Sequence, residues 1–319
     1  MNNQTAVTVF LLWGFSSFPD LQSLLFVGIF FSYVIILAAN VAIVVAIRFS
    51  HNLHTPMYFF LCGLSISETC ASMVIIPRML VDLLSHNKTI SLPECATQMF
   101  LFFGLAANNC FIMAAMSYDR YTAIHNPLNY HMLITGSICC QMMMASFLVG
   151  FLGSLGVIIT VFSLSFCDSK IIQHFFCDIS PVICLACDYT FMHEMIIFSL
   201  FVSGLVGSFL LIMISYVFIV SIVVKMSSAK GRYKAFSTCS SHLCVVSIHY
   251  GFASFVYLKP KNSGSFREDM LMAVTYTVLT PLLNPIVYSL RNKEMQIALK
   301  KVIIGNVNRF IPFLQRSNK

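Results

Sequence analysis

The sequence predicts an all-α integral membrane protein, a bundle of seven transmembrane helices followed by a short amphipathic interfacial helix. Composition is the first reason: of 319 residues 58% are hydrophobic and only 10% charged, with a mean hydropathy of +0.84. Soluble domains are nearer 45–50% apolar and about 25% charged. Long uncharged stretches and an uneven distribution of Lys and Arg are the other two reasons. Soluble, disordered and fibrous proteins are therefore excluded.

Seven stretches are long enough to cross a bilayer, which takes about 20 mostly apolar residues. Together they contain one charged residue, Glu68. They are residues 24–47, 57–77, 96–118, 137–166, 195–224, 235–258 and 270–290. Long unbroken runs predict helices, since a transmembrane β-barrel would show short alternating segments instead.

The positive charges predict the orientation. Thirteen of the nineteen Lys and Arg residues lie on the side of the C-terminus, and six lie on the other side. The positive-inside rule places the C-terminus in the cytosol. We therefore expect an extracellular tail over residues 1–23, a seven-helix domain over 24–290 and a cytoplasmic amphipathic helix and tail over 291–319 in a multi-pass plasma-membrane protein.

Five cysteines lie on the predicted outer side, where the compartment is oxidising and disulfides form. They are Cys95, Cys167, Cys177, Cys184 and Cys187. An odd number allows at most two bridges and leaves one thiol over. The spacing of Cys184 and Cys187 also matches a redox or zinc motif, but no second ligand pair follows, so no metal site is predicted.

Two glycosylation sequons also lie outside, at Asn3 and Asn87. We expect the glycan on Asn3, in a free tail about twenty residues from the membrane, because Asn87 lies close to the bilayer.

Polar residues within the spans are candidates for function, because they are costly at membrane depth. Glu68 lies midway along the second span, and Asn40, Asn109 and Asn284 lie at similar depth. We predict one polar cluster that can hold a proton or a small cation and repack between states. A purely structural hydrogen-bond network is the alternative, and the two do not exclude each other.

Two motifs lie at the cytosolic ends of spans 3 and 7. The first is Asp119-Arg120-Tyr121, and an Asp–Arg pair at this depth can also be a simple interfacial anchor. The second is Asn284-Pro285-Ile-Val-Tyr288, where Pro285 breaks a helical hydrogen bond and makes a hinge. Each alone is a modest signal, but both together on a seven-span chain are specific.

With these motifs the chain resembles a rhodopsin-like G-protein-coupled receptor and, more narrowly, a vertebrate odorant receptor of class II, the terrestrial class. The resemblance extends almost end to end. It includes Leu-His-Thr-Pro-Met-Tyr-Phe-Phe over residues 53–60, Ser215-Tyr216, and Lys-Ala-Phe-Ser-Thr-Cys-Ser-Ser-His-Leu over residues 234–243. The last string and Pro-Met-Tyr-Phe-Phe-Leu are specific to odorant receptors, whereas the other motifs occur in many receptors.

The resemblance implies that an odorant binds in the outer half of the bundle. On span 3, four of the expected ligand-binding residues share one helical face: Phe102, Phe103, Ala106 and Cys110. Motif offsets add others on spans 5 to 7: Phe201, Gly204, Tyr250, Ala253, Ser254, Tyr257, Val274 and Thr277. This uncharged lining suits a small, neutral, mostly apolar volatile ligand. Simple core packing is the alternative.

The resemblance also implies coupling to a Gs-type, olfactory heterotrimeric G protein that raises cAMP. Asp119 would hold Arg120 at rest, and Arg120 would contact the G protein after span 6 moves. Tyr216 and Tyr288 would then move inward, and Tyr121, Asn284 and Pro285 belong to the same signalling motifs. Cys95–Cys177 and Cys167–Cys187 are the disulfides that the resemblance implies, with Cys184 free.

After span 7, apolar residues recur at helical spacing, which predicts the interfacial helix. They are Met295, Ala298, Leu299, Val302 and Ile303. Lys293, Lys300 and Lys301 are available to lipid headgroups, and the basic stretch over residues 225–234 also attracts anionic membrane lipids.

Other classes of protein fit less well. A non-odorant rhodopsin-like receptor shares the architecture but would favour a charged pocket. Many transporters are built from internal repeats, but this sequence shows no internal repeat and its seven spans do not divide into two equal halves. No protease or hydrolase motif is present, so no catalytic residues and no enzyme activity are expected. No cofactor is predicted, since span 7 has no lysine for retinal, and no nucleic-acid partner is predicted.

Overall fold

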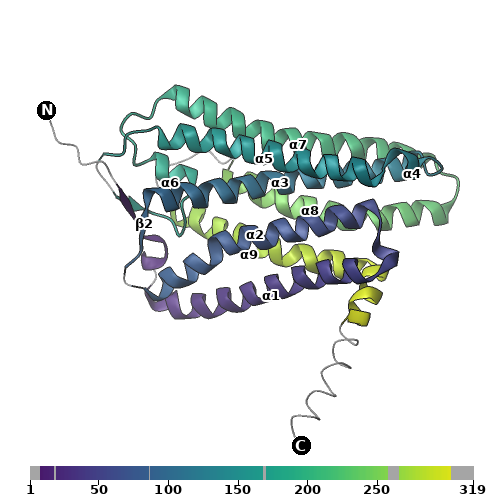
Figure 1. Cartoon of the computed structure of the whole chain (residues 1–319), viewed down its shortest axis with the longest axis horizontal. Coiled ribbons are helices and arrows are strands. Elements are labelled where there is room, and N and C mark those ends of the chain that lie inside the picture. Colours follow the sequence, from purple (N-terminus) through teal and green to yellow (C-terminus); the bar gives the residue numbers. More distant parts are fainter. Residues whose placement is uncertain (1–7, 18, 86, 168–169, 258–265, 303–319) are drawn as a thin grey trace, which may run out of the picture.

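The computed structural model describes residues 8–17, 19–85, 87–167, 170–257 and 266–302, and these residues form a helical bundle (Figure 1). Seven of the described helices are long and apolar enough to cross a membrane, as the sequence predicts. They are α1 Gln22–Phe49, α2 Pro56–Leu84, α3 Leu92–His125, α5 Gly136–Phe162, α7 Phe191–Lys225, α8 Ala229–Tyr257 and α9 Phe266–Arg291.

Most of these helices run past the apolar stretches that predict them. The helix α8 begins six residues before the expected start at 235, and α2 continues through Pro77 to Leu84. Likewise α9 contains both Pro281 and Pro285. A bundle tolerates such prolines because neighbouring helices and polar side chains satisfy the freed backbone groups. For most of the helices the apolar run therefore marks the middle and not the ends, whereas the run over residues 137–166 continues four residues beyond the end of α5.

Small residues let α5 pack closely against α3. A Cβ atom at Gly150 would lie 2.9 Å from the backbone oxygen of Gly104 and 2.8 Å from the backbone nitrogen of Asn108. One turn further on, the Ser154 hydroxyl donates a hydrogen bond to the Phe100 carbonyl at 2.8 Å. Such small-residue contacts are the usual basis of close helix pairing in membranes.

A small sheet covers one end of the bundle, called the sheet end below. The strands are β1 Val9–Leu12, β2 Thr89–Ser91 and β3 Ile171–Ile172, in the order β2-β1-β3. The central strand β1 pairs antiparallel with β2 and parallel with β3. The 3-10 turns η1 Gly14–Ser17 and η2 Pro19–Leu21 then lead into α1.

The expectation of a free N-terminal tail is therefore wrong for residues 9–17. Phe10, Leu12 and Phe15 are buried, because β1 and η1 pack on the segment between α5 and α7. Gly14 has a φ of +21°, and a Cβ atom there would lie 3.0 Å from Cα of Phe175. This close approach of two backbones explains the glycine.

The opposite end, called the tail end below, carries the short helices η3 His51–Leu53 and α4 Tyr130–Leu133 (Figure 1). Residues 293–302 form a further helix after α9, as the sequence predicts. Met295 and Ala298 are buried on its inner face, whereas Lys293, Lys300 and Lys301 are exposed. The predicted Ile303 lies outside the described residues. Back at the sheet end, α6 Ile179–Ile183 completes the segment between α5 and α7.

Candidate functional site

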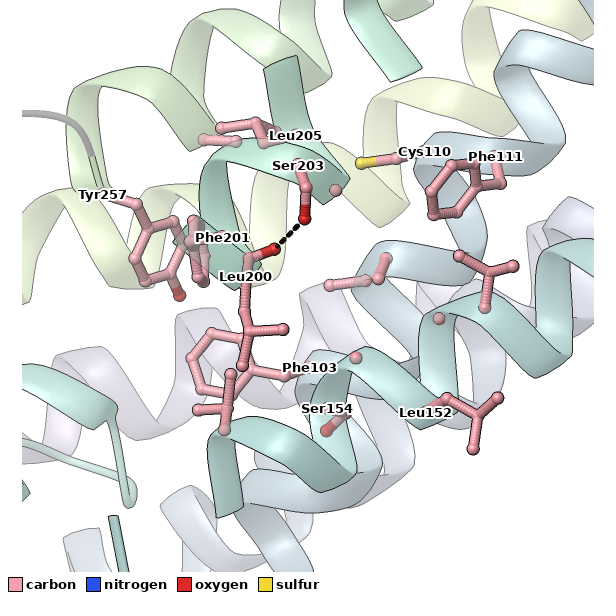
Figure 2. A pocket seen from close by; sticks show the side chains of 18 of the residues that line it. Phe103, Cys110, Phe111, Leu152, Ser154, Leu200, Phe201, Ser203, Leu205 and Tyr257 are labelled. Atoms are coloured by element: carbon pink, nitrogen blue, oxygen red, sulfur yellow. Dashed lines mark hydrogen bonds between the residues drawn. The ribbon is translucent and has the colours of Figure 1, made fainter. Parts of the chain in front are cut away.

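A cavity of about 500 Å³ lies among α3, α5, α7, α8 and α9 (Figure 2). Twenty of the described residues line it, and none of these is Asp, Glu, Lys or Arg. The rings of Phe103, Phe201 and Tyr257 meet at one side, with centroids 4.9 to 5.9 Å apart. The lining also reaches the outside of the bundle between α5 and α7, where Val149 and Leu152 are more than half exposed.

Seven of the twelve expected ligand-binding residues line this cavity. They are Phe103, Ala106, Cys110, Phe201, Gly204, Ala253 and Tyr257. Their convergence follows from helical spacing, since Phe103, Ala106 and Cys110 lie on the face of α3 that turns toward α5 and α7.

The structure places the other five expected residues elsewhere. Phe102 packs edge-on against Phe176, with centroids 5.2 Å apart. The Tyr250 hydroxyl donates to Ser208 Oγ at 2.7 Å, because a buried phenol needs a partner. Thr277 faces a second, smaller cavity and donates to the Ala273 carbonyl. Ser254 and Val274 are half-buried and absent from the lining of the main cavity.

The sequence analysis missed thirteen of the twenty lining residues, including all six of α5. The α5 wall includes Gly150, Gly153 and Ser154, and its signal was the series of small residues in an otherwise bulky span. The missed residue of α9 is Tyr276, and the missed residue of α8 is His249, whose signal was a polar side chain in an apolar span. The other five come from α3 and α7: Ala107, Phe111, Leu200, Ser203 and Leu205.

The predicted intramembrane polar residues lie around the second cavity, of about 30 Å³, or next to it. Asn284 donates a hydrogen bond to Glu68 Oε1, which joins α9 to α2. Asn40 donates to the Pro281 carbonyl at 3.3 Å, which joins α1 to α9. Glu68 and Asn109 both line the small cavity, and one oxygen of each is buried with no hydrogen-bond partner in the described part of the chain. The cavity has room for one or two waters, which could satisfy these atoms.

At the tail end of α3, Asp119 is bound by two partners. Arg120 Nη2 lies 2.6 Å from Asp119 Oδ2, and the Tyr130 hydroxyl donates to Asp119 Oδ1 at 2.5 Å. Burial, followed by the hydrogen bond to the Asp119 carboxylate, raises the pKa of Tyr130, so this phenol stays protonated as a donor. The neighbouring Tyr121 stacks on His125 with ring centroids 5.3 Å apart.

The remaining predicted signalling residues lie between α3 and the last three helices. Tyr216 of α7 contacts His242 of α8, with its hydroxyl 2.8 Å from Nδ1. Tyr288 of α9 is buried, and its hydroxyl has no hydrogen-bond partner among the described residues. A buried orphan hydroxyl at the end of α9 is free to take a new partner if the helices move.

Two disulfides link segments of the chain at the sheet end. Cys95, at the start of α3, is bonded to Cys177, and Cys167 is bonded to Cys187, with Cα–Cα distances of 5.4 and 5.9 Å. Cys184 is a free, exposed thiol. Of the two sequons, Asn87 is exposed and Asn3 lies outside the described residues.

Comparison with known proteins places the chain in a family. A family model described as "Olfactory receptor" matches residues 29–306. Human olfactory receptor 10R2 is 52% identical over 94% of this chain and 90% of its own length. Human olfactory receptor 10T2 is 51% identical over 95% of this chain and 96% of its own. The chain belongs to the olfactory receptor family.

The olfactory receptor also shares its fold with a solved receptor structure. Squid rhodopsin superposes with a TM-score of 0.72 over 89% of this chain and 80% of that chain, at 17% sequence identity. The resemblance to rhodopsin-like G-protein-coupled receptors and to odorant receptors is thereby confirmed. This olfactory receptor is a multi-pass plasma-membrane receptor and not an enzyme.

Proposed function

We propose that this olfactory receptor binds small, neutral, mostly apolar volatile compounds in the 500 Å³ cavity. It then activates a Gs-type, olfactory heterotrimeric G protein and so raises cAMP. The observation that supports the ligand class is the lining itself, which is aromatic and aliphatic with a few hydroxyls and no charged side chain. A charged ligand in such a site would lose its hydration without gaining a counter-charge.

The size of the ligand limits its affinity. At about 25 cal/mol per Å², a ligand that buries about 250 Å² of apolar surface gains about 6 kcal/mol. That free energy corresponds to a dissociation constant of tens of micromolar. We therefore expect weak binding and broad selectivity among compounds of similar size.

Ligand binding would act on α8, which borders both the cavity and the signalling residues. Tyr257 packs on Phe103 and Phe201 at the cavity, and His242 of the same helix contacts Tyr216. Outward movement of α8 would free Arg120 from Asp119, while Tyr216 and Tyr288 would move inward around the hinge at Asn284 and Pro285. Raising the active fraction from 1% to half takes a preference of about 100-fold, or about 2.7 kcal/mol.

The polar cluster around Glu68 would repack in the same transition. The Glu68–Asn284 hydrogen bond links α2 to the hinge of α9, and the small cavity beside it has polar walls. We propose that this cluster holds water, a proton or a small cation in the resting state.

The sheet end would face the outside, and the tail end the cytosol. The excess of Lys and Arg in the segments at the tail end supports this orientation. Residues 1–23 would then form the extracellular segment, 24–290 the membrane domain and 291–319 the cytoplasmic helix and tail. The exposed lysines of residues 293–302 would bind lipid headgroups. The basic stretch over residues 225–234 would attract anionic lipids and the acidic faces of the G protein.

Arg120→Ala tests the signalling half of this proposal. Cells that express an N-terminally epitope-tagged receptor are screened against several hundred volatiles with a cAMP reporter. We expect the variant to lose the odorant response, because Arg120 is the proposed contact with the G protein. Antibody staining of intact cells measures surface expression and the orientation together. A full response by Arg120→Ala at equal surface level, or a tag reached only after permeabilisation, would contradict the proposal.

A further inference from the structure

One ring nitrogen of a histidine in the cavity wall has no hydrogen-bond partner among the described residues. His249 of α8 is 2% exposed and lines both the main cavity and the small cavity beside Glu68. Its Nε2 lies 3.4 Å from Cys110 Sγ of α3, while Nδ1 is buried and no described residue forms a hydrogen bond with it. Buried polar atoms are satisfied in the great majority of native proteins, so an orphan nitrogen at a cavity calls for an occupant.

The serine hydroxyls in the cavity lining are already engaged. Ser154 donates to the Phe100 carbonyl at 2.8 Å, and Ser203 donates to the Leu200 carbonyl at 2.9 Å, as Figure 2 shows for the second pair. The Tyr250 hydroxyl donates a hydrogen bond to Ser208, and neither residue is part of the cavity lining. Among the polar residues of the cavity wall, His249 is therefore the most deeply buried one that still has an atom unpaired within the described residues, the ring nitrogen Nδ1.

The geometry around His249 also fixes which way a ligand would lie. Counted along α3 and α8, His249 and Cys110 lie about 10–12 Å deeper in the bundle than Tyr257 and Phe103, at 1.5 Å per residue. The aromatic group of Phe103, Phe201 and Tyr257 thus marks the sheet-end side of the cavity, and the imidazole marks its inner side. A compound with one polar end would place that end at His249 and its apolar body against the rings.

We propose that His249 binds the polar end of the ligand and that the preferred ligands are alcohols. This inference rests on the proposed function, in which the cavity is the odorant site. In either tautomer, an imidazole nitrogen is a donor or an acceptor. A hydroxyl group serves both cases, an ether oxygen serves only the donor case, and a hydrocarbon serves neither. The receptor therefore favours an alcohol over an ether or an alkane of the same size.

The test compares three compounds with equal numbers of heavy atoms: 1-octanol, heptyl methyl ether and nonane. Shorter sets built on 1-butanol and 1-hexanol are matched in the same way. cAMP responses are measured for the wild type, His249→Phe and His249→Gln at matched surface expression. Phe keeps a planar ring but removes both nitrogens, and Gln restores a donor and an acceptor. Ser32→Ala is the control, because it removes a hydroxyl of α1 that is bonded to the Gly28 carbonyl of its own helix and is not part of the cavity lining.

We expect the wild type to respond to an alcohol at about ten-fold lower concentration than to the matched ether, the factor that about 1.4 kcal/mol supplies. His249→Phe should lose that factor for alcohols and leave the ether within about two-fold, while His249→Gln regains part of it and Ser32→Ala changes little. An equal loss for all compounds in His249→Phe would show a merely structural residue and overturn the inference. So would an alcohol preference that survives in His249→Phe but disappears in Tyr257→Phe or Tyr276→Phe.

The same experiment separates this inference from the proposed function. If the wild type responds to volatiles of other classes but shows no preference for alcohols, the inference fails and the proposed function stands. If no volatile in the several-hundred-compound screen raises cAMP at normal surface expression, both fail.

Discussion

Asp119 is a deeply buried carboxylate that depends on two neighbours. Its side chain is 1% exposed, while that of Arg120 is 14% exposed. A buried charge left without partners is strongly destabilising, so Arg120 and Tyr130 both stabilise the resting arrangement. In the proposed function the two partners differ, because Arg120 leaves Asp119 to bind the G protein while Tyr130 stays on α4. Tyr130 therefore sets how firmly the resting state is held.

Tyr130→Phe removes one hydrogen bond to this carboxylate and leaves the ring in place. A hydrogen bond to a charged group contributes about 1.5–3 kcal/mol, so its loss weakens the resting state. We expect basal cAMP to rise about two- to five-fold at equal surface expression. Tyr118→Phe is the control, since Tyr118 is 46% exposed on the same helix as Asp119. Basal signalling at the wild-type level in Tyr130→Phe would argue against this role.

His174 gives the sheet end a pH dependence. It lies between the rings of Phe175 and Phe176, and burial lowers its pKa from the usual 6.5 to about 3. The folded segment keeps the imidazole neutral, while the unfolded segment binds a proton below about pH 6.5. Stability is therefore complete above that pH and falls as the pH drops from about 6.5 toward 3.

We expect the melting temperature of the purified receptor to fall when the pH is lowered from 7.5 to 5. The fall should be smaller in His174→Phe, because phenylalanine cannot bind a proton. Thermal unfolding in detergent measures both. If the wild type and His174→Phe lose the same number of degrees, the pH dependence comes from another group.

At the scale of elements, the sheet and its disulfides hold the helix ends together. β1 joins segments that lie before α1, between α2 and α3, and between α5 and α7. Cys95 and Cys177 are fully buried and tie the last of these segments to α3. The backbone nitrogen of Cys177 also donates to Gln98 Oε1 at 3.0 Å, one turn along α3. The cover of the bundle is therefore fixed to the helix that forms much of the cavity wall.

Cys95→Ser should cost much of the receptor's stability, because this disulfide closes a loop of 82 residues. Loss of a native disulfide typically costs about 2–5 kcal/mol, and we expect surface expression to fall by more than half. Cys184→Ser is the matched control and should change little, because this thiol is free and exposed. Non-reducing peptide mapping that pairs Cys184 with any other cysteine would refute the assigned pairing.

Elements differ in how far the sequence predicts them. Each long helix leaves a run of apolar residues, which is a local signal. The sheet has no such signal, since its strands are two to four residues long and come from distant segments. The face of α3 follows from spacing within one helix. On α9 the expected Thr277 and the observed Tyr276 differ by one residue, or 100° of rotation, which a motif offset does not resolve.

At the scale of the whole molecule, α3 and α8 connect the cavity to the signalling residues. Cys110 at the cavity and Asp119 at the tail end lie about 14 Å apart along α3. On α8, His249 and Tyr257 line the cavity while His242 contacts Tyr216. A ligand that shifts α8 relative to α3 therefore changes the cavity and the signalling residues at the same time. In the proposed function, this arrangement relays odorant binding to the G protein.

Filling the cavity tests this account most directly. A Cβ atom at Gly204, in the cavity wall, would have no described atom within 4 Å, so there is room to begin a side chain there, and we expect Gly204→Leu to fill part of the cavity. Gly28→Leu is the matched control, because Gly28 also meets no atom within 4 Å but lies exposed on α1. The measurement is the odorant-evoked cAMP response of both variants at matched surface expression. We predict that Gly204→Leu loses at least about ten-fold in potency and that Gly28→Leu responds as the wild type does; an unchanged odorant response in Gly204→Leu would contradict the account.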